Sequence, residues 1–246
     1  MPGAEPFAFE GGPTGVLLIH GFSGSPGALR RIGEWLAARG HAVMCPRLPG
    51  HGTRWQNLGR TRWQAWANES IRALKDLDAK VDTVVAFGFS FGGGLALHLA
   101  ARYPDAVDGV VLVNPWLKER PLWTLAPALK WIIPSGRGVI NDIKKPGEDE
   151  IGYERIPVKA LAEAVAFHKV VKRELARTRQ PLLVFQSNED HAIPTGSSAL
   201  ILDRVGSEQK DLVPLENSYH VATLDHDAEL IFERTHEFAE SLASRS

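Results

Sequence analysis

Short apolar runs alternate with amphipathic segments along most of this chain. Alternation of this kind predicts strands joined by crossover helices around a parallel sheet. Several runs are apolar at nearly every position, as in strands that helices cover on both faces. We therefore expect an α/β fold with a mainly parallel, doubly wound sheet. The expected strands are residues 16–20, 42–45, 83–89, 109–113, 182–186 and 211–215, with residues 7–9 as the candidate for a further edge strand.

Helix boundaries are marked by residues that favour helix ends. Ser25 and the proline after it predict a helix start, and Gly40 predicts the end of that helix. Thr61 and Gln64 have the spacing of a capping box, which predicts the start of another helix. Two further helices are expected at about residues 160–177 and 228–244.

One long stretch, residues 115–179, carries no strand signal although clear strand candidates flank it. Connections in compact domains are usually far shorter, and long insertions are usually functional. We therefore expect one domain over residues 1–246 with a helical cap inserted at about 115–179, rather than a plain surface excursion. The insertion is rich in apolar side chains, including Trp116, Trp123 and Trp131.

Charge and cysteine content exclude several classes of protein. The 28 basic and 29 acidic residues give a formal net charge of −1, which argues against a nucleic-acid-binding surface. The single cysteine, Cys45, rules out an internal disulfide and a multi-cysteine zinc site. No apolar run approaches the roughly 20 residues that a membrane span requires, and the first residues lack the pattern of a signal peptide. We expect a cytoplasmic globular protein without a metal site.

The strongest local motif is Gly88-Phe89-Ser90-Phe91-Gly92, which follows a predicted strand and opens a predicted helix. A nucleophile elbow requires that placement. The flanking glycines remove Cβ atoms where the tight turn brings strand and helix together. The alternative is a glycine-rich turn that only connects the two elements. The placement favours Ser90 as a nucleophile.

A serine hydroxyl needs a base within hydrogen-bond reach. At an elbow of this kind the serine is followed along the chain by an acid and then by a histidine. The loop after residues 182–186 offers Glu189 and Asp190, and the loop after residues 211–215 offers His220 and His226. His220 has the better position, in a short loop between the last strand and the terminal helix.

An oxyanion hole requires two backbone N–H groups aimed at the charge of a tetrahedral intermediate. Phe91, the residue after the nucleophile, is one expected donor. The other is Phe22, in a loop after the first long strand where Gly21 permits a close approach. His20, at the end of that strand, is expected to shape the loop rather than to act as a base.

Five segments of the chain resemble the α/β-hydrolase superfamily: HGF at 20–22, PGHG at 49–52, GFSFG at 88–92, NEDHAIP at 188–194 and SYHVATLDHD at 218–227. Within it, the HGFSG loop, the short chain and the HVATLD stretch resemble bacterial carboxylesterases and monoacylglycerol lipases. The resemblance implies an α/β-hydrolase fold with Ser90 as nucleophile, Asp190 as acid partner and His220 as base. It also implies hydrolysis of esters of short- to medium-chain acids without a cofactor.

Substrate contacts are expected from Gly21, Trp116, Ile193 and Val221, and the expected partner is a small-molecule ester. The tryptophans of the insertion suit an acyl chain, or they pack the cap's own small core. A hydrolase of carbon–carbon bonds or an acyltransferase shares every motif above and stays an alternative. A non-catalytic ligand-binding protein is disfavoured because all three triad residues are present. The oligomeric state is left open.

Overall fold

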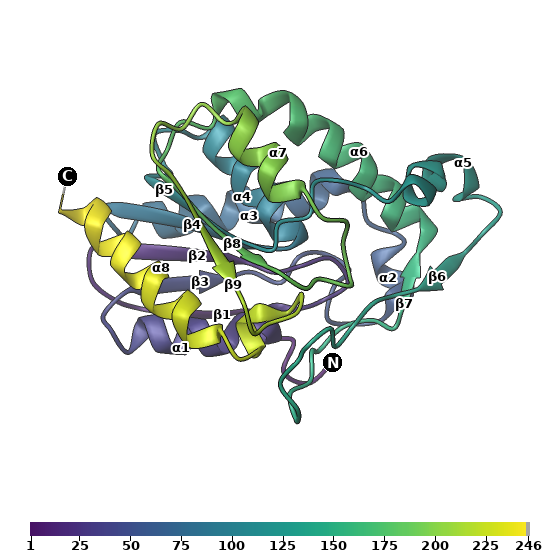
Figure 1. Cartoon of the computed structure of the whole chain (residues 1–246), viewed down its shortest axis with the longest axis horizontal. Helices are drawn as coiled ribbons and strands as arrows, with labels where there is room; N and C mark the ends of the chain where they lie inside the picture. Colours follow the sequence, from purple (N-terminus) through teal and green to yellow (C-terminus); the bar gives the residue numbers. More distant parts are fainter. Residues whose placement is uncertain (245–246) are drawn as a thin grey trace.

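The computed structural model describes residues 1–244 and shows a seven-stranded sheet with helices on both faces (Figure 1). The strand order is β1-β3-β2-β4-β5-β8-β9; β1 pairs antiparallel with β3, and the other neighbours pair parallel. The strands are β1 (Phe7–Phe9), β2 (Thr14–Ile19), β3 (Ala42–Cys45), β4 (Thr83–Phe89), β5 (Gly109–Val113), β8 (Leu182–Ser187) and β9 (Lys210–Leu215). The predicted strands, including the edge strand, are confirmed to within two residues.

Helices cover the sheet in two layers. In Figure 1, α1 and α8 lie on one side of the sheet, and α3, α4 and α7 lie on the other. The helices of the sheet layers are α1 (Arg30–Ala37), α3 (Trp63–Asp78), α4 (Phe91–Arg102), α7 (Ser197–Arg204) and α8 (Ala228–Ala243). Shorter helical segments are η1 (Pro26–Leu29), α2 (Trp55–Leu58), η3 (Leu175–Arg177) and η4 (Ala222–Leu224), where η denotes a 3-10 helix.

Each face of the sheet has its own apolar core, which explains why the strands lack polar alternation. From β2, Leu17 and Ile19 point into the core shared with α3 and α4. Val16, which precedes them, and Leu18, which lies between them, point into the core shared with α1 and α8. Since successive side chains of a strand point to opposite faces, a strand covered on both faces must be apolar throughout.

The segment between β5 and β8 contains η2 (Pro121–Leu125), α5 (Ala126–Leu129), β6 (Ser135–Arg137), β7 (Arg155–Pro157) and α6 (Val158–Glu174). The prediction that this stretch lacks strands is wrong, because β6 and β7 form an antiparallel pair. Each of these strands has three residues, and most of them are polar or exposed. Such strands carry no apolar periodicity by which a sequence could reveal them. The helix predicted at 160–177 is confirmed as α6 and η3.

Two predicted helix starts differ in detail. Ser25 precedes the 3-10 turn η1, and its hydroxyl donates to the carbonyl of Ile151 (2.8 Å) instead of capping the helix. The capping box is wrong, because α3 begins after Arg62 without a side-chain cap. The Thr61 hydroxyl donates instead to the carbonyl of Leu58 (2.7 Å). Both hydroxyls therefore form hydrogen bonds with other backbone carbonyls and do not cap the predicted helices.

The remaining helix predictions are confirmed. The first helix ends at Ala37, and Gly40 follows in the left-handed conformation (φ 89°) that glycine favours. The terminal helix buries Ile231 and Leu242 against the sheet and half-buries Phe238. Throughout residues 1–244, no helix combines the length and the apolar character that crossing a bilayer would require.

Candidate active site

Ser90 lies at the sharp turn between β4 and α4, with φ 54° and ψ −116°. A non-glycine residue rarely adopts a positive φ, and a nucleophile elbow imposes it. A Cβ atom on Gly92 would overlap the carbonyl group of Ile19, and one on Gly88 would overlap the backbone of Gly92 and Gly93. The two motif glycines therefore permit the turn that holds the Ser90 hydroxyl at the carboxyl edge of the sheet.

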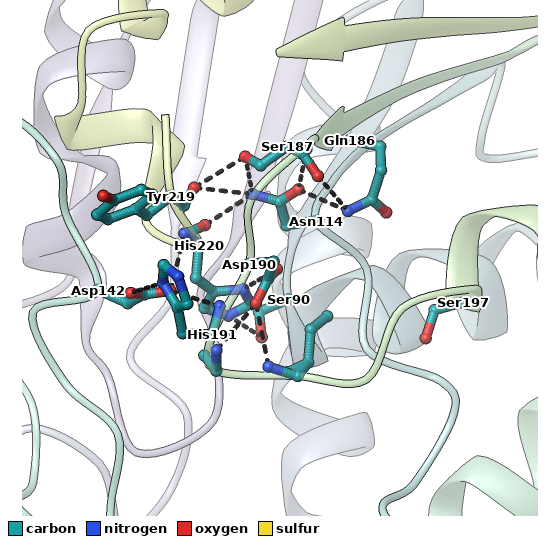
Figure 2. Close-up of polar contacts among 12 residues, drawn as sticks. Ser90, Asn114, Asp142, Gln186, Ser187, Asp190, His191, Ser197, Tyr219 and His220 are labelled. Carbon is teal, nitrogen blue, oxygen red and sulfur yellow. Dashed lines mark hydrogen bonds and ion pairs between the residues drawn. The ribbon is translucent and has the colours of Figure 1, made fainter. Parts of the chain in front are cut away.

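The structure brings Ser90, His220 and Asp190 together in one hydrogen-bonded row (Figure 2). His220 Nε2 lies 2.9 Å from Ser90 Oγ, and His220 Nδ1 lies 2.8 Å from Asp190 Oδ2. Asp190 follows β8 and His220 follows β9, so both come from loops at the carboxyl edge. The other oxygen of Asp190 accepts hydrogen bonds from the amides of Ala192 and Ile193 at 3.0 Å each. The row has the geometry of a serine–histidine–acid triad.

The other acid and histidine considered from the sequence lie outside this row. Glu189 is exposed and forms an ion pair with Lys144 (3.5 Å). His226 is exposed at the surface. His20 is fully buried, and its Nε2 accepts the amide hydrogen of Leu48 at 3.1 Å, as expected of a residue that shapes a loop.

The electrostatics of the row favour a charged Asp190 and make His220 more basic. Burial opposes protonation of His220, but the hydrogen bond and charge of Asp190, with Glu150 and Asp142, outweigh it and raise the pKa of the imidazole. Burial likewise opposes ionisation of Asp190, but His220 and two backbone amides outweigh it and lower the pKa of that carboxyl. The imidazole is therefore prepared to take a proton from Ser90.

The two predicted oxyanion donors lie beside Ser90. Phe91 is the first residue of α4, and the loop with Phe22 follows β2. A Cβ atom on Gly21 would lie 3.3 Å from Ser90 Cβ, so this loop contacts the elbow directly. The rings of Phe22 and Phe91 pack against each other with centroids 5.6 Å apart. The loop that carries Phe22 and the first turn of α4 therefore both lie next to Ser90.

A cavity of about 370 Å³ lies over Ser90 and His220. Its walls are mostly apolar, and the inserted segment supplies many of them, including Trp116, Trp123, Leu129, Ile133 and Leu161. Of the four residues predicted to contact substrate, three line this cavity, namely Gly21, Trp116 and Ile193.

Two expectations about the substrate pocket fail. Val221 does not line the cavity, because its side chain is buried in the core beneath α1 and α8. Trp131 is 76% exposed on the outer side of the inserted segment, so it neither lines the cavity nor packs a core. Trp116, by contrast, is 4% exposed and contacts the rings of Phe22 and Trp123.

Asn114, which the sequence did not mark, fixes the loop that carries His220 (Figure 2). It follows β5 with φ 43° and is fully buried. Its Nδ2 donates to the carbonyl of His220 (2.8 Å) and to Ser187 Oγ (2.9 Å). Its Oδ1 accepts the amide hydrogen of Ser187 at 2.8 Å. One amide side chain therefore joins the ends of β5 and β8 to the histidine loop.

Asp142, in the inserted segment, joins the two loops that carry Asp190 and His220. Its Oδ2 accepts hydrogen bonds from the backbone amides of His191 (3.0 Å) and His220 (3.2 Å). Its Oδ1 lies 2.9 Å from His191 Nδ1 (Figure 2), and its carbonyl accepts the amide hydrogen of Val221 at 3.0 Å. The carboxylate therefore links the acid loop to the base loop from outside the sheet.

Glu150 is the one carboxylate among the residues that line the cavity. Its side chain lies against Gly24, where a Cβ atom would come within 2.8 Å of Glu150 Oε1. Burial raises the pKa of this carboxyl, against the opposing charge of His220. A hydrogen-bonding group therefore faces an otherwise largely apolar space close to the triad.

Comparison with known proteins places the chain among lipolytic enzymes. Residues 14–227 match the family model described as serine aminopeptidase, S33. The chain is 37% identical to the thermostable monoacylglycerol lipase of Bacillus sp. (strain H-257), over 97% of this chain and 95% of that protein. It is 28% identical to the carboxylesterase of Bacillus subtilis (strain 168), over 97% of each. A solved structure from a report on LipS and LipT, two metagenome-derived lipolytic enzymes, matches with a TM-score of 0.95 and 36% identity, covering 98% of this chain and 99% of that one.

Proposed function

Because the chain belongs to the serine aminopeptidase S33 family of α/β-hydrolases, we propose that it is a serine esterase that cleaves monoacylglycerols and related esters of short- to medium-chain acids. The α/β-hydrolase resemblance and fold predicted from the sequence are confirmed by this membership and by the matching structures. The proposal rests above all on one observation, the hydrogen-bonded row Ser90–His220–Asp190 at the floor of a mostly apolar cavity.

In the proposed reaction His220 takes the proton of Ser90 Oγ as that oxygen attacks the ester carbonyl. Asp190 orients the imidazole and stabilises its positive charge. The amides of Phe22 and Phe91 donate to the oxyanion, each contributing about 3 kcal/mol to the barrier reduction. The tetrahedral intermediate collapses, and the alcohol leaves with the proton from His220. Water, deprotonated by His220, then cleaves the acyl-enzyme and releases the acid.

The cavity supports an acyl chain as the apolar part of the substrate. Its volume of about 370 Å³ is at the lower end of the range for small-molecule sites. The apolar walls contributed by Trp116, Trp123 and Leu129 suit a chain of methylene groups. Glu150 suits the alcohol part, because a carboxylate accepts hydrogen bonds from the free hydroxyls of a glycerol ester. The apolar lining and the carboxylate of Glu150 together favour a monoacylglycerol as the natural substrate.

The proposal is tested by covalent labelling with a serine-reactive fluorophosphonate, followed by hydrolysis of a series of monoacylglycerols of increasing chain length. We expect one label per chain, located at Ser90 by peptide mass mapping, and a maximum of kcat/KM within the short to medium chain lengths. Labelling at another serine would contradict the nucleophile. Cleavage of aminoacyl anilides without cleavage of monoacylglycerols would contradict the substrate class.

Glu150→Gln should weaken the use of glycerol esters more than the use of esters whose alcohol has no hydroxyl. An amide accepts hydrogen bonds less strongly than a carboxylate, and the difference amounts to about 1–1.5 kcal/mol. We therefore expect KM for a monoacylglycerol to rise roughly tenfold and KM for a nitrophenyl ester of the same acid to stay within about twofold. An equal change for both esters would show that Glu150 does not contact the alcohol.

Asp142→Asn should shift the pH dependence of hydrolysis towards acid. His220 must be neutral to accept the Ser90 proton, so kcat/KM rises with pH through the pKa of His220. The negative charge of Asp142 helps to raise that pKa, and removing the charge lowers it. We expect the acidic limb to move to lower pH and the plateau to fall about 5- to 30-fold, as the two loops lose a charged hydrogen-bond acceptor.

The matched control for this variant is Asp149→Asn, which neutralises an exposed carboxylate of the same segment that accepts a hydrogen bond from Asn141 (2.9 Å). Its pH profile should coincide with that of the unmodified protein. If Asp142→Asn also left the acidic limb in place, Asp142 would have no electrostatic influence on His220.

A further inference from the structure

Three side chains of the kinds that bind metal ions meet at the end of the sheet opposite Ser90. His41 directly precedes β3, at the amino end of the parallel strands, whereas Ser90 follows the carboxyl end of β4. His236 and Glu240 lie one turn apart on α8, so both project from the same side of that helix. One ligand atom from each of the three residues lies within 4.8 Å of the other two.

The geometry of the cluster is close to that of a tetrahedral metal site. His41 Nε2 lies 2.7 Å from His236 Nδ1 and 3.8 Å from Glu240 Oε1. Bonds of about 2.0–2.1 Å to a tetrahedral zinc ion place neighbouring donor atoms about 3.3 Å apart. The two observed separations lie on either side of that value, so small rotations of side chains would bring all three donors to bonding distance.

The surroundings prepare His41 to act as a ligand. Its ring also forms a hydrogen bond with the backbone of Thr14, and a second hydrogen bond of this kind typically orients a metal-bound histidine. The side chain of Glu240 is 59% exposed and that of His41 is 2% exposed, so an ion would enter from the α8 side.

We propose that His41, His236 and Glu240 form a binding site for a divalent transition metal such as zinc, with water as the fourth ligand. Two imidazole nitrogens and one carboxylate oxygen suit zinc, cobalt or nickel better than calcium or magnesium. The ion takes the place of the proton between His41 Nε2 and His236 Nδ1, and that proton moves to Nε2 of His236, so both ligands stay neutral imidazoles. Bound there, the metal connects the start of β3 to the terminal helix. The proposed hydrolysis does not involve it.

The site is tested by titrating the full chain, freed of metal with a chelator, with cobalt(II) and with zinc(II). We expect the strong visible absorption of tetrahedral cobalt at one equivalent, its loss on addition of zinc, and a melting temperature that rises with zinc concentration. His236→Ala and Glu240→Gln should each weaken cobalt binding more than about tenfold. Both positions are partly or largely exposed, so these variants leave the buried His41 in place and the fold intact.

The matched control is His191→Gln, which removes an exposed imidazole paired with the carboxylate of Asp142 (2.9 Å). This variant should bind cobalt as the unmodified protein does. The proposal is wrong if cobalt gives only the weak spectrum of an octahedral ion, or if His236→Ala binds cobalt with unchanged affinity. It is also wrong if His191→Gln, and not His236→Ala, abolishes the tetrahedral spectrum. None of these outcomes depends on ester hydrolysis.

Discussion

Ser90→Ala should abolish ester hydrolysis and leave the fold unchanged. The substitution removes the oxygen that would form the acyl-enzyme, and no other nucleophile is close to His220 Nε2 in the hydrogen-bonded row. We expect kcat to fall by about 10⁵- to 10⁶-fold. Alanine keeps the Cβ atom of serine, so the strain of the positive φ at this position does not change. The melting temperature should therefore stay within a few degrees of that of the unmodified protein.

The measurement is hydrolysis of a nitrophenyl butyrate, with fluorophosphonate labelling on the same samples. Ser198→Ala is the matched control, because Ser198 is also buried and its hydroxyl donates to Gln186 (2.6 Å), outside the cavity. That control should lose less than about tenfold in activity and keep the label. Turnover retained in Ser90→Ala would refute the acyl-enzyme, and an equal loss in both variants would indicate a disturbed fold instead.

Most of the fold could be predicted because the central strands of the large sheet are buried on both faces. Burial of that kind requires apolar residues at nearly every position, as in β4 (Thr83–Phe89) and β5 (Gly109–Val113), and a sequence displays it directly. The short pair β6 and β7 lacks this signal, since its residues are mostly exposed and pair through the backbone. The sequence could indicate that residues 115–179 leave the sheet, but not how they are arranged.

Some residues of the candidate site could likewise be predicted from the sequence, and others could not. Ser90 and His220 could be proposed because each follows a recognisable strand, and the resemblance to α/β-hydrolases favours Asp190 over Glu189 after a third strand. Asn114 and Asp142 could not, because their contacts with His220 span 106 and 78 residues of sequence. An asparagine after a strand and an aspartate in a polar loop are common in any sequence. Only the folded chain distinguishes them from solvated side chains.

Two of the wrong expectations fail because of contacts that a local sequence pattern does not include. Val221 is expected to contact the substrate, yet its side chain is buried in the core on the α8 side of the sheet. Thr61 is expected to cap a helix, yet its hydroxyl donates to the carbonyl of Leu58 and accepts the indole hydrogen of Trp66 at 3.1 Å. The core residues around Val221 come from distant parts of the chain, whereas the partners of Thr61 lie only three and five residues away but outside the spacing of a capping box.

Asp190→Asn should lower kcat by about 10⁴-fold while the backbone around it stays in place. The carbonyl oxygen of an asparagine can still accept the amide hydrogens of Ala192 and Ile193, as Asp190 Oδ1 does. Its amide group, however, donates a hydrogen bond to His220 Nδ1 instead of accepting one. The imidazole proton then resides on Nε2, and this tautomer cannot take the proton of Ser90. The loss also includes the negative charge that stabilises the imidazolium and raises the pKa of His220.

Two measurements separate this effect from a displaced loop. The acidic limb of kcat/KM should move to lower pH in Asp190→Asn, because an imidazole without its carboxylate is a weaker base. Glu189→Gln removes an exposed charge one residue earlier. This control should leave the acidic limb at the same pH and change kcat by no more than about twofold. Since the fluorophosphonate also reacts through the His220-activated serine, labelling should slow in parallel with kcat. A fast label with slow turnover would place the role of Asp190 in deacylation alone, and an unchanged kcat would assign the acid to another residue.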